Sequence, residues 1–120
     1  MPSSIEPKQG EIWMVQFDPS TGDEIGKRRP AIVLSNERVG FLKLRLMCPI
    51  TDWKERYSKF PWFSYLEPDP RNGLSKPSGA DVFQCKSLSL ERFHNLLGVI
   101  EAEQFADIID RLNFCLKRFS

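Results

Sequence analysis

The sequence predicts a small, mainly antiparallel β-sheet that curls into a barrel-like domain, with one C-terminal helix packed against it. Several short apolar runs rich in β-favouring residues follow one another, separated by polar loops. The last part of the chain instead carries apolar residues at helical spacing. The chain has 120 residues without an internal repeat or linker, so we expect a single domain over residues 10–120. Residues 1–9 are expected to form a flexible N-terminus.

Alternation and composition place the strands. Residues 11–17 are apolar on both faces, which indicates a strand buried on two sides. The run at 43–50 begins by alternating charged and apolar side chains, which is typical of a half-exposed strand. The remaining strands are predicted at 30–35, 62–66, 80–86 and 95–100. Residues 87–93 are expected to form one helical turn.

A helix over residues 101–119 is the clearest predicted element. Its apolar residues recur at the spacing of one helix face: Phe105, Ile108, Ile109, Leu112, Cys115, Leu116 and Phe119. Glu101 and Glu103 in the first turn, with Lys117 and Arg118 in the last, complement the helix dipole. The apolar face is therefore expected to pack on the sheet.

A polar loop at 18–29 separates the first two predicted strands. The loop is about a dozen residues long and ends in Lys27, Arg28 and Arg29. Loops of this length in a compact domain are usually lids or binding loops, and the alternative is a disordered hairpin tip. Pro30 then begins the next strand, a position where a missing N–H is tolerated.

The overall charge does not indicate a nucleic-acid-binding protein, because the formal net charge is only +1. Binding to RNA would need a local positive field. The cationic end of the 18–29 loop is the first candidate, and a second cluster consists of Lys54, Arg56 and Lys59. The alternative for both clusters is a solvated surface.

No apolar run approaches the ~20 residues needed to cross a bilayer, and residues 1–8 lack the apolar segment of a signal peptide. We therefore expect a cytoplasmic protein without membrane contact. Cys48, Cys85 and Cys115 form no C-x-x-C pair and are interpreted as reduced, small apolar residues. We expect neither a metal site nor a cofactor. The single histidine, His94, excludes a mechanism with two imidazoles and is interpreted as structural.

An ordered set of motifs resembles the MazF/PemK/Kid toxins, small sequence-specific endoribonucleases of bacterial toxin–antitoxin pairs. The motifs are Gly10-Glu11-Ile12-Trp13, Phe17-Asp18-Pro19, Gly22-Asp23-Glu24, Arg29-Pro30 with Val33-Leu34, Cys48-Pro49-Ile50-Thr51, and Gln84. The resemblance implies an SH3-like, CcdB-like barrel that forms a homodimer. It also implies an mRNA interferase, which inhibits translation and growth until a cognate antitoxin lays an acidic segment over its basic groove.

Metal-free RNA cleavage would proceed by attack of the 2′-OH on the adjacent phosphorus, giving a 2′,3′-cyclic phosphate and a 5′-OH. Arg29 is the expected stabiliser of the phosphoryl oxygens, because a guanidinium offers a planar fork of donors. The family's Arg and Thr pair falls on Arg29 and Thr51. The alternatives are a surface ion pair of Arg29 with Asp23 or Glu24, and a Thr51 that merely caps a turn.

The sequence alone does not assign the general base. Glu24 lies five residues before Arg29 and is our candidate, provided that the site raises its pKa; otherwise it is a solvated loop carboxylate. Some family members use an Asp and an Arg from a later strand. This chain shows Asp81 and Gln84 with Lys86 at that level, which is a loose correspondence.

Five residues are expected to bind substrate: Lys27, Arg28, Phe17, Trp53 and Gln84. Trp53 follows Thr51 by two residues and is expected to stack on a single-stranded base, as are Tyr57 and Trp62. The alternative is that these aromatic rings cover the core or a dimer surface.

Two other functions compete with the nuclease. A CcdB-like toxin binds DNA gyrase without cleaving anything, but it has no need of the Arg29 and Thr51 pair. Trp and acidic residues would be expected at the end of its last helix, whereas this chain ends in Lys117-Arg118-Phe119-Ser120. A peptide-binding barrel would not explain why Arg29 and Thr51 occur together.

Overall fold

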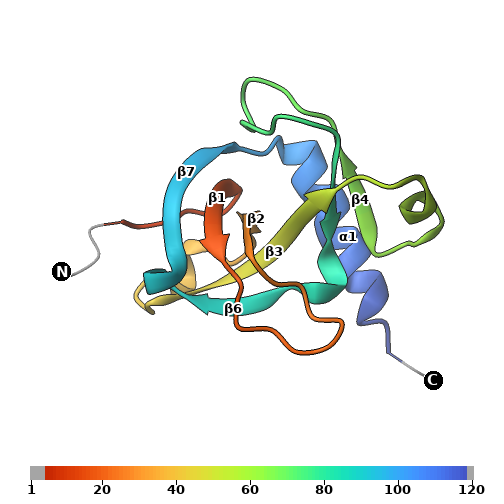
Figure 1. The fold of residues 1–120 in the computed structure, drawn as a ribbon. Coiled ribbons are helices and arrows are strands. Elements are labelled where there is room, and N and C mark those ends of the chain that lie inside the picture. The colour runs from red at the N-terminus through yellow and green to blue at the C-terminus, as the bar shows by residue number, and fades with distance from the viewer. Residues whose placement is uncertain (1–4, 119–120) are drawn as a thin grey trace.

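A curled antiparallel sheet with one helix against it forms the domain, in a computed structural model that describes residues 5–118 (Figure 1). The strands are β1 (Glu11–Gln16), β2 (Arg28–Val33), β3 (Leu44–Asp52), β4 (Phe63–Leu66), β5 (Ser78–Asp81), β6 (Lys86–Ser89) and β7 (Phe93–Val99). Four 3₁₀ helices connect them: η1 (Glu37–Val39), η2 (Glu55–Lys59), η3 (Val82–Gln84) and η4 (Leu90–Arg92). The helix α1 (Ala102–Cys115) closes the chain. The predicted fold class is confirmed.

The long strand β3 organises the sheet. The strand order is β4-β5-β3-β2-β1-β7, all neighbours are antiparallel, and β6 also pairs with β3. One edge of β3 pairs with β2, while its other edge pairs first with β6 and then with β5. Register shifts between β1 and β7 mark bulges, which bend and twist a strand and so help the sheet to curl.

The core has two parts because β1 is buried on both faces, as its sequence predicts. Ile12 packs with residues of β2, β3 and β5 in the part that α1 covers, and Ile108 is the fully buried residue of that helix. Trp13, Val15 and Phe17 share the other face of the chain and pack with Leu88 and Phe93 in the second part. The observed burial follows the period of two that strands impose.

Polar contacts fix α1 to β4. The Ser64 hydroxyl donates to Asp107 Oδ2 at 2.6 Å, and Arg111 Nε donates to the same oxygen at 2.8 Å. Arg111 also donates from Nη1 to the carbonyl of Pro61 at 3.0 Å.

None of the helices in residues 5–118 has the length and apolarity that crossing a membrane would require.

Three predicted elements need correction. In place of the strand expected at 80–86, β5 begins two residues earlier and is followed by η3. In place of the helical turn expected at 87–93, the chain forms the strand β6 and then η4. The helix expected at 101–119 ends at Cys115, so Lys117 and Arg118 lie beyond it. Tertiary pairing causes the first shift, because residues 78–81 are the ones that pair with β3 and β4.

Part of the predicted flexible segment lies against the sheet. Pro7 is buried, and its carbonyl accepts from Nε of the buried Arg45 at 2.9 Å. Gln9 Nε2 donates to the carbonyl of Leu34 at 2.9 Å. Residues 1–4, and Phe119 of the predicted last helical turn, lie outside the described residues.

Candidate active site

A cleft of about 360 Å³ opens where β2 begins and β3 ends. Arg28, Arg29 and Pro30 of β2 line one side together with Ile50, Thr51 and Asp52 of β3. The β4–β5 loop, residues 67–77, contributes Gly73, Leu74, Ser75 and Lys76. The cleft therefore lies between two strand ends and a loop that is remote from them in the sequence.

Arg29 and Thr51 meet because their strands are neighbours. Ala31 pairs with Pro49 in the antiparallel register of β2 and β3, and two residues further along this register lie Arg29 and Thr51. Arg29 Nη1 donates to Thr51 Oγ1 at 3.2 Å, and its Nε donates to the carbonyl of Gly26 at 2.7 Å. Both residues are half-buried. Within residues 5–118, the guanidinium is thus held by a carbonyl and a hydroxyl rather than by Asp23 or Glu24.

The β1–β2 loop, residues 17–27, leads into Arg29 and is closed at its base. Phe17 N donates to the carbonyl of Lys27 at 2.8 Å. Lys27 has a φ of 69°, in the left-handed region that residues other than glycine seldom occupy. This turn brings the chain into β2 immediately before the two arginines.

Two side chains from later in the sequence hold the β1–β2 loop. Gln84 Oε1 accepts from Ile25 N at 2.5 Å, and Gln84 Nε2 donates to the carbonyl of Asp23 at 3.2 Å. Arg92 Nη1 donates to the carbonyls of Gln16 and Asp18 at the start of the loop. The loop is therefore anchored near its start and in its middle.

The cleft is locally positive although the chain is almost neutral. Its lining includes Arg28, Arg29 and Lys76, against the single carboxylate of Asp52. The formal charge of these side chains is three positive minus one negative, or +2, compared with +1 for the whole chain. A focused positive field of this kind favours an anionic ligand.

A family model described as PemK-like, MazF-like toxin of type II toxin–antitoxin system matches residues 8–116. The chain belongs to this family. Endoribonuclease MazF9 of Mycobacterium tuberculosis (strain ATCC 25618 / H37Rv) is 30% identical over 119 residues, which cover 94% of this chain and 98% of that protein. The family resemblance seen in the motifs is confirmed.

Solved structures of MazF proteins share the fold. The crystal structure of MazF (Form-I) from Deinococcus radiodurans aligns with a TM-score of 0.80 and 27% identity, over 96% of this chain and 100% of that one. A structure of MazE-MazF (Form-II) from the same organism aligns with a TM-score of 0.73 and 27% identity, over 97% of this chain and 100% of that one.

In this MazF-like chain the other predicted site residues are dispersed. Glu24 accepts from Thr21 N at 2.8 Å and lines a separate hollow of about 500 Å³ that Gln84 also lines. Lys27 is exposed and lies outside the lining of the cleft. Phe17 is fully buried, so it belongs to the core and not to a substrate groove, because it lies on the same face as Val15.

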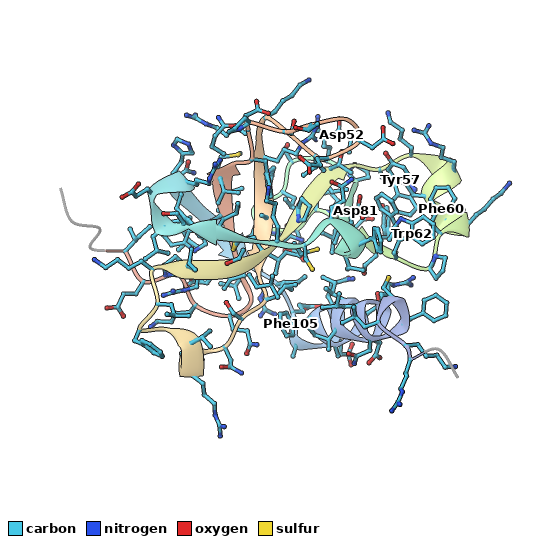
Figure 2. The ribbon with its side chains drawn as sticks, turned by 90° about the horizontal axis from the view of Figure 1, so that it is seen from below. Asp52, Tyr57, Phe60, Trp62, Asp81 and Phe105 are labelled. Carbon is cyan, nitrogen blue, oxygen red and sulfur yellow. The ribbon has the colours of Figure 1, made fainter. Side chains whose placement is uncertain are left out.

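Trp53 is half-buried in an aromatic cluster beside the cleft. Its ring makes T-shaped contacts with Tyr57 at 5.7 Å and with Tyr65 at 5.0 Å. Tyr57 stacks on Phe63 with centroids 3.9 Å apart, and Phe60 stacks on Trp62 at 4.8 Å. Figure 2 shows Tyr57, Phe60 and Trp62 gathered beside one another at one end of the molecule. The rings thus support one another, and stacking of Trp53 on RNA stays a prediction.

Other polar groups lie away from the cleft. Asp81 is buried, its Oδ1 lacks a hydrogen-bond partner, and burial raises its pKa. Cys48, Cys85 and Cys115 are free thiols, and burial raises the pKa of Cys48 well above its usual value. His94 is exposed on β7. Among residues 5–118, no three His, Cys, Asp or Glu side chains gather so as to hold a metal ion.

The β4–β5 loop is the part of the site that the sequence does not reveal. We expect only a loop there from its Pro, Gly, Asn and Ser content. The glycine at position 73 is the sequence signal for a turn, and in the structure its φ of 71° lies in the left-handed region. Nothing local in the sequence shows that this turn packs beside β7 and so brings Lys76 to the cleft.

Proposed function

We propose that this MazF-like chain is a sequence-specific, metal-independent endoribonuclease that cleaves single-stranded mRNA. Cleavage leaves a 2′,3′-cyclic phosphate and a 5′-OH. The observation that carries the proposal is the contact between Arg29 and Thr51 at the floor of a positively charged cleft. Membership of the toxin family and the naming of the curated relative MazF9 as an endoribonuclease support it.

Arg29 has the geometry to stabilise a phosphorane. Its Nε donates to the carbonyl of Gly26 and one Nη1 hydrogen is donated to Thr51. The other N–H groups of the guanidinium can therefore bind two phosphoryl oxygens. Loss of one such donor typically costs about 3 kcal/mol of transition-state stabilisation, which is on the order of a hundredfold in rate. The Thr51 hydroxyl accepts from the guanidinium and so orients it, and its O–H group donates a hydrogen bond to the same phosphate.

Glu24 is the proposed base for the 2′-OH, and this role requires the β1–β2 loop to move. Its carboxylate now accepts from Thr21 N and lies outside the lining of the Arg29 cleft. Replacement of Glu24 by Gln tests the role: single-turnover cleavage should slow on the order of a hundredfold if Glu24 is the base. An unchanged rate would remove Glu24 from the mechanism.

The biological setting is proposed from the family. The toxin would act in the cytoplasm as a homodimer, inhibiting translation and growth until a cognate antitoxin neutralises it. The crystal structures of MazE-MazF from Deinococcus radiodurans support an antitoxin partner. An acidic antitoxin segment would complement the positive charge of the cleft.

The direct test is cleavage of a long single-stranded RNA in EDTA, with both ends of every product mapped. Wild type is expected to cut at a short recurring motif and leave cyclic phosphates, and Arg29→Ala is expected to lose the activity. Arg38→Ala, which removes an exposed arginine of η1, is the matched control and should cut normally. Equal cutting by wild type and Arg29→Ala would contradict the assignment. Absence of cutting by both would favour gyrase binding, for which a supercoiling assay is the next test.

A further inference from the structure

We propose that Lys76 is a second phosphate-binding residue of the cleft, and that Asp52 holds its ammonium group and competes with RNA for it. This inference rests on the proposed function and extends it to a residue outside the Arg29 and Thr51 pair. The supporting juxtaposition is that Lys76 Nζ lies 3.1 Å from Asp52 Oδ1, and both residues line the cleft.

Lys76 reaches the cleft from a different element than Arg29. Asp52 pairs with Ser78 in the register of β3 and β5, so Lys76 lies just before the start of β5 and close to the end of β3. Asp52 lies on the side of the sheet that faces away from Phe105 and α1 (Figure 2). The two cations thus come from different elements that line one cleft, which Thr51 also lines.

The loop that carries Lys76 is fixed by the backbone of β7. Val99 N donates to the carbonyl of Arg71 at 2.8 Å. A Cβ at Gly73 would lie 2.1 Å from the carbonyl oxygen of Leu97, and a Cβ at Gly98 would lie 2.2 Å from that of Arg71. Such close approach leaves no room for side chains, so the loop is held against the strand.

An internal polar network adds to this rigidity. The side chain of Asp69 accepts from the amides of Arg71 and Asn72 at 2.8 and 2.7 Å. The buried Asn72 in turn donates from Nδ2 to the carbonyl of Glu67 at 2.8 Å, and its Oδ1 accepts from Leu74 N at 2.9 Å. Lys76 therefore extends from a preorganised wall, which lowers the ordering cost of binding.

The pair between Lys76 and Asp52 is suited to exchange. The two side chains are 61% and 62% exposed, and ion pairs at that exposure contribute little to stability. A phosphate that enters the cleft can replace the carboxylate as the partner of the ammonium group. Arg29 would hold the scissile phosphate with its planar fork, while Lys76 contacts the adjacent phosphate of the same strand as a point charge.

Opposite effects of the two partners distinguish this proposal from a structural ion pair. Lys76→Gln removes a ligand of the RNA, whereas Asp52→Asn removes its competitor and one negative charge from the cleft. If the pair only stabilised the fold, the two substitutions would act in the same direction. Lys43→Gln, at an exposed lysine just before β3, serves as the matched control.

The experiment is binding of a fluorescent, fully 2′-O-methylated RNA oligonucleotide, which cannot be cut by 2′-OH attack. It carries the mapped cut-site sequence, or oligouridylate if no cut is found, so binding is measured apart from cleavage. We expect Lys76→Gln to weaken binding about fivefold to tenfold, and Asp52→Asn to strengthen it by up to about fivefold. One lost contact to a single strand lowers the slope of log K against log salt by about 0.7. The ratio of wild-type to Lys76→Gln affinity should therefore fall about 2.6-fold between roughly 50 and 200 mM salt.

Two results would overturn the proposal: equal affinity and salt slope for wild type and Lys76→Gln, or weaker binding by both Lys76→Gln and Asp52→Asn. In cleavage assays, Lys76→Gln should raise KM and leave kcat nearly unchanged. If wild type binds in this way but does not cut, the proposed function fails while the phosphate site stands. If wild type cuts and the Lys76 variant matches it, the phosphate site fails alone.

Discussion

Replacing Gln84 by Ala removes the two hydrogen bonds that join the middle of the β1–β2 loop to η3. One links Gln84 Oε1 to Ile25 N at 2.5 Å and the other links Gln84 Nε2 to the carbonyl of Asp23 at 3.2 Å. A hydrogen bond typically contributes about 0.5–1.5 kcal/mol net. The Asp23 bond is exposed and counts at the low end, so together they hold the loop closed by about 1–2 kcal/mol.

Gln84→Ala is therefore expected to raise the open population of the loop about 5- to 30-fold. The assay is native-state hydrogen exchange at the Glu24 amide, which donates to the carbonyl of Thr21 within the loop and keeps its acceptor in the variant. This amide should lose protection by the same factor while amides of β3 do not change. The same loop carries the Gly26 carbonyl that holds Arg29 and the proposed base Glu24, so cleavage is a second readout. Cleavage slows if the placement of Arg29 limits the rate, and it speeds up if the movement of Glu24 does. Ile25 still packs on the core, so the loop is not expected to unfold completely.

Gln104→Ala is the matched control for this experiment. Its Nε2 donates to the Ser64 hydroxyl at 2.8 Å, far from the β1–β2 loop in the sequence, so it deletes a similar amide without touching that loop. Unchanged protection of the Glu24 amide in Gln84→Ala would show that the two hydrogen bonds do not hold the loop closed. Equal loss of protection in Gln104→Ala would show the same, because the effect would then be global.

Three further substitutions test other parts of the structure. Thr51→Val should slow single-turnover cleavage about tenfold by deleting one hydrogen bond, and Thr51→Ser should restore most of it. Gly73→Ala combines a positive φ with a Cβ 2.1 Å from Leu97 O, so a larger fall in Tm is expected than for Gly22→Ala, where φ is +59° and the space is open. The pKa of Asp107 lies below its usual value because its hydrogen bonds and its arginine partner outweigh the effect of burial. The ionised carboxylate therefore stabilises the fold above the pKa that Asp107 has in the unfolded chain, and this stabilisation is lost as pH falls through its pKa in the folded protein. Asp107→Asn should lower the midpoint of urea unfolding at pH 7, and in acid its midpoint should equal that of wild type.

The sequence predicts the floor of the cleft because local rules fix it. Arg29 and Thr51 lie at the beginning and end of two apolar runs, and antiparallel pairing of those runs brings them opposite one another. The apolar residues on both faces of β1 likewise predict burial on both faces. Applied one residue further, the alternation of faces along the strand assigns Phe17 to the core, against the motif-based expectation that it lines the groove.

Other parts depend on contacts that no local pattern encodes. Gln84 stands out in the motifs, but its hydrogen bonds to the β1–β2 loop span about sixty residues of sequence. Lys76 reaches the cleft only because Gly73 packs against β7. The strand β6 exists through pairing with β3, which overrides the expectation of a helical turn.

In the proposed reaction, the cleft promotes attack by the 2′-OH at a phosphate held by Arg29. Single-turnover cleavage of an oligoribonucleotide with one 2′-deoxy nucleotide at the mapped cut position, beside the unmodified strand in EDTA, tests this step. We expect the modified strand to stay intact, and the unmodified strand to yield a 2′,3′-cyclic phosphate that Arg29→Ala fails to produce. Cutting of the modified strand, with a 5′-phosphate on the product, would exclude attack by the 2′-OH.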